Sequence, residues 1–536
     1  MRMFTLACFL LLTAGSARGQ VTFTSLFFID DEVLDQAPGT TVSALYRRRP
    51  LNDSGEIIFR ADIVRESASG GSDIAVLRHT PSSGLTTLLS EGDQAFGLPN
   101  SVEYDSVDYI QKKNSGGYVL EVATLRGQGI VDSNNRIAYL NHPKGERLIL
   151  ARSGDQMPSM PDGVLFDRAT PTDVNKNGTA ILSASIRGPG VFNSNDSLLS
   201  VSDGISQTVL SREGEQAPLL PSGVLYSRFI DSSINNNDQI QLSVQLVGNG
   251  ITDDNNEALY HSDGSGNFTL LAREGEQVPG QPAGTVYTGA LTSSRLNNRG
   301  HTAFRVGLAG PSVTTGNGLV LMSNRDGGSL QPVARMGDQV SGLPDGVLYR
   351  RFGYNKPVLN NRDDILISAD LSGAGVTGHN DRAITLFRSD NTIDIIAREG
   401  DLAPGFESPV EFSQLPIAYT ELNDAGQVAF VSPLHDGINH FSGLFATDLS
   451  GELKLLVAEG QLFDIDDDPA VEDFRTIYQI LPDISMNNHG QIAFYALFYD
   501  APAGMFIATI PAPASAAVLT LGLLIARRSR SAPCPS

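Results

Sequence analysis

The chain of 536 residues carries 60 acidic and 38 basic side chains, a formal net charge of −22, and no tryptophan. A protein this acidic repels the phosphates of nucleic acids and of anionic lipids, which excludes nucleic-acid binding as its function. The two cysteines, Cys8 and Cys534, lie near opposite ends of the chain, so the composition also excludes a disulfide-stabilised scaffold.

Residues 1–19 have the pattern of a secretory signal. Arg2 supplies the positive charge, Phe4–Thr13 is the apolar core, and Ala17–Gly19 is a cleavage site of small residues. We therefore expect the chain to be exported, with the mature protein beginning at Gln20.

Residues 20–510 repeat one unit eight times. Each unit contains an Asn-x-x-Gly turn followed by a run in which apolar and polar residues alternate, and successive turns are 60 to 64 residues apart. A fixed period of this length predicts a repeat architecture. The turns begin at Asn52, Asn114, Asn175, Asn235, Asn297, Asn360, Asn423 and Asn487.

The residues of this turn have a physical explanation. The Asn side chain can accept bonds from the backbone that follows it, and Gly three places later adopts positive φ without steric cost. Asp238 and Asp363 replace the Gly in two units, and Asp is among the few other residues that tolerate this conformation. We therefore assign a structural role to the clearest copies of the turn, Asn297, Gly300, Asn423, Gly426, Asn487 and Gly490.

Each unit contains four short segments with the alternation of β-strands. In the fourth unit these segments are Gly223–Phe229, Gln239–Leu246, Ala258–His261 and Phe268–Arg273. Four strands per radially repeated unit is the pattern of a β-propeller. We predict an all-β fold with almost no helix, namely an eight-bladed β-propeller. A seven-bladed ring and an open β-solenoid are the alternatives.

The two ends of the repeat body complement each other. The last unit has only three predicted strands, near Arg475–Leu481, Gln491–Phe498 and Gly504–Ile510, whereas Val21–Ile29 forms a strand that belongs to no unit. The N-terminal strand is therefore predicted to complete the last blade and close the ring, which would leave neither edge unpaired.

Two repeated features contain groups that could bind cations. An acidic residue follows the Gly of a second motif at Asp93, Asp155, Glu215, Glu276, Asp338 and Asp401, and loops such as Asp253–Glu257 are rich in Asn and Asp. Rings of carboxylates can attract cations, and Ca²⁺ prefers oxygen ligands. Turn capping and pairing with nearby arginines explain the same residues without a metal, so both interpretations stay open.

One acidic cluster lies outside the repeat pattern, at Asp464, Asp466 and Asp468. A solvated loop, a Ca²⁺ site and a catalytic acid pair are the alternatives for it, and Ca²⁺ is the one cofactor that the sequence suggests. His435 and His440 form a second irregular stretch, but no third metal ligand is evident beside them. The sequence contains no established catalytic motif, and we assign no catalytic residue.

The C-terminal segment, residues 511–536, has the pattern of an anchor. Pro511 and Pro513 precede the apolar run Ala514–Ala526, which Arg527 and Arg528 follow. As a helix the 13-residue run spans about 20 Å, less than the ~30 Å of a bilayer core. We expect it to hold the chain at the inner membrane with the arginines in the cytoplasm.

These motifs resemble two known families. The tail is similar to the PEP-CTERM sorting signals that exosortases process in Gram-negative bacteria, with Ala512 where that signature has Glu. The body resembles the bacterial tandem-repeat surface proteins of the Asn-x-x-Gly-x-x-Ala-Phe, or choice-of-anchor, type. The resemblance implies export, an exosortase-like sorting enzyme as partner and a cell-surface location. It implies no catalytic residues.

Two functional hypotheses follow from the sequence. In the first, the protein is a non-enzymatic, surface-anchored module that binds a polysaccharide or another surface protein, or that builds extracellular matrix. In the second, it is a secreted carbohydrate-active hydrolase or lyase that uses one face of the propeller. The second hypothesis requires polar residues outside the repeat pattern to converge on one pocket.

Overall fold

The computed structural model describes residues 21–46, 50–65, 72–110, 116–264, 266–289, 291, 295–353, 356–416, 419–466 and 471–510. Within these ranges the chain forms strands and turns, and no helix that could cross a membrane is present. The predicted secretory signal, the C-terminal sorting segment, Asn114 and Asp468 lie outside the described residues.

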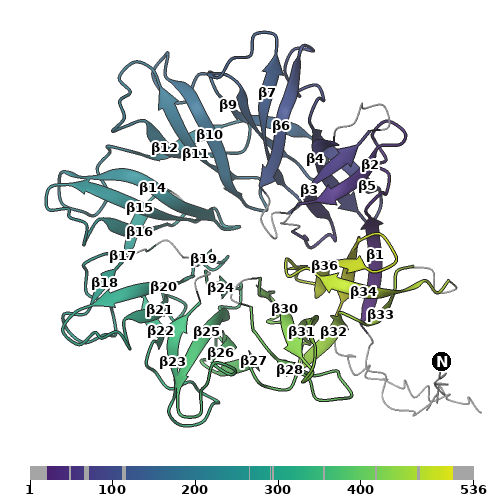
Figure 1. The fold of residues 1–536 in the computed structure, drawn as a ribbon. Helices are drawn as coiled ribbons and strands as arrows, with labels where there is room; N and C mark the ends of the chain where they lie inside the picture. The colour runs from purple at the N-terminus through teal and green to yellow at the C-terminus, as the bar shows by residue number, and fades with distance from the viewer. Residues whose placement is uncertain are drawn as a thin grey trace, which may run out of the picture.

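Eight antiparallel sheets surround a central axis (Figure 1). This arrangement confirms the predicted all-β, eight-bladed propeller, and it excludes both the seven-bladed ring and the open solenoid. Blades 1 to 4 contain β2 (Thr41–Leu45), β3 (Ile57–Val64), β4 (Ser72–Thr80), β5 (Gly84–Ser90); β6 (Val102–Ile110), β7 (Val119–Gly127), β8 (Arg136–Asn141), β9 (Arg147–Arg152); β10 (Leu165–Val174), β11 (Ala180–Arg187), β12 (Ser197–Ser202), β13 (Gln207–Arg212); β14 (Val224–Ile234), β15 (Ile240–Gly248), β16 (Glu257–Ser262) and β17 (Phe268–Arg273).

The inner strand is split into two short pieces in each of blades 5, 6 and 7. These blades contain β18 (Val286–Thr288), β19 (Arg295–Leu296), β20 (Thr302–Ala309), β21 (Leu319–Ser323), β22 (Gln331–Arg335); β23 (Val347–Phe352), β24 (Val358–Leu359), β25 (Ile365–Gly373), β26 (Arg382–Phe387), β27 (Ile393–Arg398); β28 (Glu411–Phe412), β29 (Glu421–Leu422), β30 (Val428–His435), β31 (His440–Thr447) and β32 (Leu453–Ala458). In blades 3 and 4 the corresponding strands, β10 and β14, run without a break.

The N-terminal strand completes the last blade, as predicted. Blade 8 contains β33 (Leu462–Asp464), β34 (Phe474–Ile480), β35 (Ser485–Met486), β36 (Gln491–Phe498), β37 (Gly504–Thr509) and β1 (Thr22–Phe28). Strand β1 pairs antiparallel with β37, from Thr22 opposite Thr509 to Phe28 opposite Gly504. In Figure 1 the purple β1 accordingly lies beside the yellow strands of the last blade. The first and last parts of the chain thus share one sheet.

The hydrophobic core consists of eight clusters, each drawn from two neighbouring blades. The Phe of the repeat motif is fully buried in the strict copies, at Phe304, Phe430 and Phe494. In blade 7 the ring of Phe430 stacks on that of Phe445 with centroids 5.7 Å apart. Because each sheet buries its apolar residues against the next sheet, the ring is stabilised as a whole, and its turns are held in fixed positions around the axis.

Candidate functional site

The first residue of the repeated turn links neighbouring blades in six of the eight units. Oδ1 of Asn297 accepts the backbone N–H groups of Arg299 and His301, each at 3.0 Å. Its Nδ2 donates to the backbone carbonyl of Asn360, the equivalent residue of the next blade, at 2.9 Å. We call these residues the anchor asparagines. Equivalent interblade bonds start at Asn175, Asn235, Asn360, Asn423 and Asn487.

The fourth residue of the turn has a positive φ, in the left-handed region, whether it is Gly or Asp. Gly300 has a φ of 80°, and the two substitutes, Asp238 and Asp363, have φ values of 60° and 72°. The Asp carboxylates also bond to the preceding blade, because Oδ1 of Asp363 accepts Nδ2 of Asn297 at 2.7 Å. Asp at this position therefore combines the backbone conformation of Gly with an additional link between blades.

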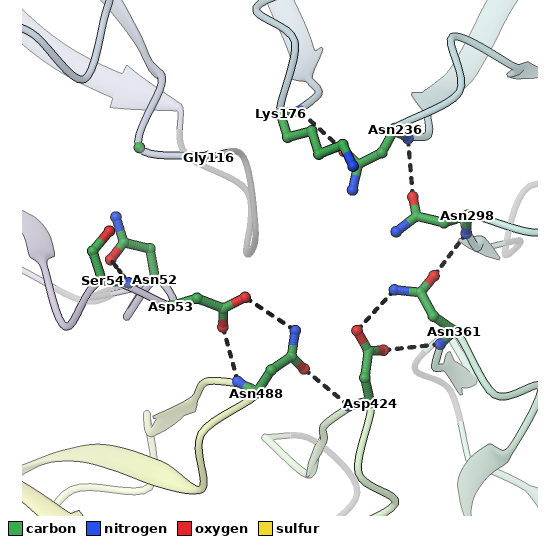
Figure 2. A pocket seen from close by; sticks show the side chains of 11 residues that line it. Asn52, Asp53, Ser54, Gly116, Lys176, Asn236, Asn298, Asn361, Asp424 and Asn488 are labelled. Atoms are coloured by element: carbon green, nitrogen blue, oxygen red, sulfur yellow. Dashed lines mark hydrogen bonds between the residues drawn. The ribbon is translucent and has the colours of Figure 1, made fainter.

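The second residues of the turns form a polar ring around the axis, shown in Figure 2, which we call the collar. The described collar residues are Asp53, Lys176, Asn236, Asn298, Asn361, Asp424 and Asn488. In the six links from Lys176 round to Asp53, the backbone N–H of one collar residue donates to a side-chain oxygen of the next, at 2.7 to 3.0 Å. Asn and Asp can both make this bond, so the fold permits either residue at most collar positions.

The collar lines a cavity with a volume of about 200 Å³, to which Ser54, Gly116 and Gly117 also contribute. Lys176, Asn236 and Asn298 come from three consecutive blades and lie together on one side of the cavity (Figure 2). Asp53 and Asp424 lie across the cavity from them. The cavity is thus polarised, with hydrogen-bond donors on one side and carboxylates on the other.

The donors on the first side are available to a ligand. Within the described residues, the Lys176 ammonium and the Nδ2 groups of Asn236 and Asn298 have no hydrogen-bond or ion-pair partner. On the other side, Asp424 accepts the N–H and Nδ2 of Asn361 at 2.9 and 2.8 Å. A carboxylate offers about four acceptor positions, so Asp424 keeps acceptor capacity toward the cavity.

The acidic cluster outside the repeat pattern lies at the end of β33 and in the loop after it, and its described residues do not line the collar cavity. Oδ1 of Asp464 accepts the backbone N–H groups of Asp466 and Asp473 at 3.3 and 3.0 Å, so this carboxylate caps its own loop. Asp466 is exposed, and Asp468 lies outside the described residues. No group of three or more His, Cys, Asp or Glu side chains in the described part of the chain is placed to hold a metal ion.

His435 and His440 face each other across the hairpin that joins β30 to β31, with ring centroids 4.5 Å apart. Strand β30 begins five residues after Asn423 and has eight residues, so this hairpin lies at the opposite end of the strand from the collar turn. At ~3.3 Å per residue the strand alone separates the histidines from that turn by roughly 20 Å. The structure therefore does not bring them to the axial cavity.

Side chains of the repeated acidic residues and of the Asn-rich loops accept backbone hydrogen bonds within their own turns, as the following examples show. Oδ2 of Asp338 accepts the backbone N–H of Arg335 at 2.7 Å. Burial raises the pKa of the Asp155, Glu276 and Asp401 carboxyls, which opposes the accumulation of negative charge at these positions. In a representative Asn-rich loop, Asn255 Oδ1 accepts the N–H of Thr252 at 2.9 Å. Turn geometry accounts for the Asn and Asp content of these positions.

The sequence analysis identified the anchor asparagines but missed the collar next to them. The residue after each anchor Asn is polar in all eight units, as Asp, Ser, Lys or Asn, but the residue that follows it varies as well, so variation alone did not mark the collar position. Only the closed ring shows that these positions face one another.

Comparison with known proteins places the chain in a family but assigns it no activity. No curated protein sequence matches it significantly. Similar solved structures include a puromycin hydrolase (11% identity, 74% of this chain and 52% of that chain, TM-score 0.34). They also include the propeller domain of the Trilobed protease of Pyrococcus furiosus (9% identity, 75% of this chain and 95% of that chain, TM-score 0.35). A third is a Trypanosoma rangeli sialidase in complex with sialic acid (12% identity, 93% of this chain and 93% of that chain, TM-score 0.27).

These likenesses concern architecture alone, because the identities are very low, and the chain spans only about half of the puromycin hydrolase. A family model built from sequences matches residues 32–346 and, in a second segment, residues 293–517. The chain therefore belongs to the DUF7453 family, a family of unknown function.

Proposed function

We propose that this protein is a non-enzymatic binding module that receives a hydroxyl-rich ligand, such as the end of a polysaccharide, in the collar cavity. The observation that carries this proposal is the polarised lining of that cavity. Unpartnered donors of Lys176, Asn236 and Asn298 lie across from the carboxylates of Asp53 and Asp424.

The chemistry of the lining favours hydroxyl groups over simple ions. A hydroxyl both donates and accepts hydrogen bonds, so a sugar ring with several hydroxyls can satisfy the donor side and the carboxylate side together. A metal cation would meet the Lys176 ammonium, and an anion would meet two carboxylates. A cavity of about 200 Å³ holds about seven water molecules at ~30 Å³ each, which limits the ligand to one sugar unit or a group of that size.

We further propose that the module works at the bacterial surface. The support is the sequence: the secretory pattern of residues 1–19, and the Pro-x-Pro, apolar and Arg segments of residues 511–536. In this proposal the export machinery moves the chain across the inner membrane of a Gram-negative-type bacterium. An exosortase-like enzyme then recognises the region of Pro511 and Pro513, while Arg527 and Arg528 remain on the cytoplasmic side.

The enzymatic alternative, a hydrolase or lyase, takes second place. It needs polar residues from outside the repeat to converge on one pocket, but Asp464 caps its own loop and His435 lies at the end of β30 opposite the collar turn. Asp53 and Asp424 are the two carboxylates among the described lining residues of the collar cavity, and each is engaged by an Asn of the preceding blade. Both carboxylates thereby also have a role in the ring itself.

The test uses the full chain, immobilised polysaccharides of different composition, and the simultaneous measurement of retained protein and released oligosaccharide. The diagnostic variant is Asn298→Asp. It keeps the oxygen that accepts the Asn236 N–H but replaces the free amide donor with a carboxylate, as Asp424 does naturally. Lys176→Ala removes the only cation of the described lining, and Lys144→Ala, on an exposed hairpin, is its matched control.

We expect the wild type and Lys144→Ala to be retained on at least one polysaccharide, and both collar variants to lose about tenfold in affinity, as for one charged hydrogen bond. Equal retention of all four proteins would refute the collar as the site. Release of oligosaccharides would refute the non-enzymatic proposal, and failure to retain the wild type on any polysaccharide would refute the ligand class.

A further inference from the structure

A second cavity, with a volume of about 160 Å³, lies between blades 2 and 3 and shares no lining residue with the collar cavity. Strands β6, β7 and β8 of blade 2 and β10 of blade 3 form its walls. The polar part of the lining consists of Ser106, Asp108, Thr124, Arg136, Arg168 and Thr170. This cavity is therefore a separate candidate site with a different charge.

The inner strand of blade 3, which forms one wall of the cavity, is unbroken. In blades 5 and 7 a residue between the two pieces of the inner strand, Leu291 or Pro416, returns to contact the preceding blade. There, Ser243 Oγ donates to the carbonyl of Leu291 at 2.8 Å, and Ser368 Oγ donates to that of Pro416 at 2.7 Å. Each serine is the eighth residue after its anchor Asn, the position of Val122 in blade 2.

Strand β10 contributes no such returning segment, because it continues from Leu165 to Val174. Val122 consequently lines the cavity, whereas Leu291 is buried to 1% exposure at the equivalent place between blades 4 and 5. The place beside Val122 is therefore open, whereas Leu291 occupies the equivalent place between blades 4 and 5.

Arg136 lacks the acidic partners that its counterpart in blade 6 has. Arg136 and Arg382 each open the third strand of a blade, and they pair with Thr124 and Asp370 respectively. Nε of Arg382 lies 3.0 Å from Asp370 Oδ1, and its Nη1 lies 3.4 Å from Glu399 Oε1. The counterpart of Glu399 in blade 2 is Ser153, so both acids are replaced by neutral residues.

Arg168 shows the same loss of an acidic partner. Its counterpart in blade 6 is Arg351, which follows the same strand bulge and lies 2.7 Å from Asp370. The residue opposite Arg168 is Ser185. Within the described residues, neither Arg136 nor Arg168 has a hydrogen-bond or ion-pair partner for its guanidinium group. Two uncompensated arginines in one cavity stand out in a chain with a net charge of −22.

The one carboxylate among the described lining residues is already engaged. Asp108 Oδ2 lies 3.8 Å from Nη1 of Arg60, and its Oδ1 accepts the backbone N–H of Tyr109 at 2.8 Å. Ser106 and Thr124 add hydroxyl groups, whose oxygens lie 2.7 Å apart. The lining therefore keeps a positive excess with several donors, the arrangement that recognises oxyanions.

We propose that this cavity binds an oxyanion group, a carboxylate, sulfate or phosphate, between the guanidinium groups of Arg136 and Arg168. The hydroxyls of Thr124 and Thr170 supply further donors. The group can be a free ion or a substituent of an acidic sugar chain, and the size of the cavity admits one such group. The site is independent of the collar and of the ligand proposed there.

The experiment is isothermal titration of the full chain at low ionic strength. Acetate, inorganic sulfate and inorganic phosphate are the free probes, and a uronic-acid oligosaccharide and a sulfated oligosaccharide carry the same groups on a sugar chain. The variants are Arg136→Gln and Arg168→Gln. Arg228→Gln is the matched control, because Arg228 occupies the position of Arg168 in blade 4 but lines neither cavity.

We expect saturable one-site binding of at least one probe, a loss of about tenfold or more in each lining variant, and no change in Arg228→Gln. A sugar-linked probe that binds more tightly than the free ion with the same group would identify the sugar chain as the source. The proposal is refuted if no probe binds saturably, or if the lining variants bind as the wild type does.

A thermal melt without added anion checks the fold of each variant. Removing one of two uncompensated cations should leave the melting temperature unchanged or raise it at low salt, because like charges repel. If either Gln variant is misfolded, Arg168→Lys replaces it. Lys keeps the charge but not the bidentate geometry, so weaker binding is still expected. Wild-type affinity in a folded Arg168→Lys would contradict the guanidinium role.

Discussion

Nδ2 of Asn487 donates a hydrogen bond of 3.0 Å to the backbone carbonyl of Asn52, 435 residues earlier in the chain. This bond joins the last anchor Asn to the first, so it closes the ring at its centre. Strand β1 closes the same ring at its periphery by pairing with β37. The collar cavity therefore depends on two contacts between the ends of the repeat body.

Asn487→Asp tests the central closure. The carboxylate can still accept the N–H groups of His489 and Gln491, but it cannot donate to Asn52 or to the Gln491 side chain. Because Asn487 is completely buried, we expect a loss of about 2–4 kcal/mol in the free energy of unfolding. Chemical denaturation followed by circular dichroism measures it.

Asn236→Asp is the matched control for this change. It makes the same substitution in a repeat turn, but the Nδ2 group that it removes has no partner within the described residues. We expect a change of less than about 0.5 kcal/mol. A comparable loss in both variants would show that added charge near the axis, rather than the lost interblade bond, causes the destabilisation.

Phe27→Ala tests the peripheral closure. Phe27 in β1 is 3% exposed, and its ring stacks on that of Phe59 in blade 1 with centroids 4.7 Å apart. Truncation should cost about 3–5 kcal/mol, because it leaves a cavity where β1 contacts the first blade. If β1 then detaches, the edge of β37 is exposed and aggregation should increase in light scattering. Phe192→Ala, at 68% exposure, should be neutral.

Much of the fold could be predicted, because the alternation of apolar and polar residues along a segment indicates directly which side chains of the strand are buried. The expected strands Phe268–Arg273 and Gln491–Phe498 coincide with β17 and β36. The inner strands were predicted less well: β14 extends to Ile234, five residues beyond the predicted end at Phe229. The last residues of β14 include the polar Asp231, Ser232 and Ser233. There the pairing with β15, rather than an apolar pattern, maintains the strand.

The candidate sites could not be predicted, because both depend on contacts between units. The side chain of Asn298 acquires its role only when Asn236, 62 residues earlier, lies next to it on the axis. Arg136 and Arg168 are 32 residues apart in sequence, and they line one cavity because blades 2 and 3 pack side by side. A period read from the sequence specifies the units but not the atoms that face each other across them.

Asp363→Gly tests whether the turn needs a carboxylate in addition to positive φ. Glycine adopts a φ of 72° more readily than Asp, so the backbone alone would favour the substitution. The variant nevertheless loses the acceptor for Asn297 at 2.7 Å and for the His301 ring at 2.8 Å. We expect a net destabilisation of about 1–3 kcal/mol. In Asp238→Gly a single interblade bond is lost, so the change should be smaller.

A more stable Asp363→Gly protein in thermal melts would contradict this expectation and would reduce the role of Asp363 to backbone conformation. The double variant Asn297→Ala/Asp363→Gly separates the contribution of the bond between these two residues from the contribution that each residue makes alone. If the bond between these residues carries the effect, the second substitution should add little to the first, whereas independent effects should sum.

Asp448→Asn tests an acid-sensitive turn between β31 and β32. Partial burial would raise the pKa of Asp448, but hydrogen bonds from the Lys454 ammonium and from Ser450 outweigh it and hold that pKa at about 2. Because the folded pKa lies below the unfolded value of about 3.9, the ionised group stabilises the protein above pH ~4, and this stabilisation is lost as the pH falls toward 2.

We therefore expect Asp448→Asn to cost about 1 kcal/mol at pH 7, a value discounted for the partial exposure of the Lys454 side chain. The difference between the wild type and the variant should shrink below pH 4 and disappear near pH 2, where the wild-type carboxyl is also neutral. Denaturation midpoints at several pH values measure this difference. A difference that persists unchanged at pH 2 would show that the contribution of Asp448 comes from the shape of the turn and not from its charge.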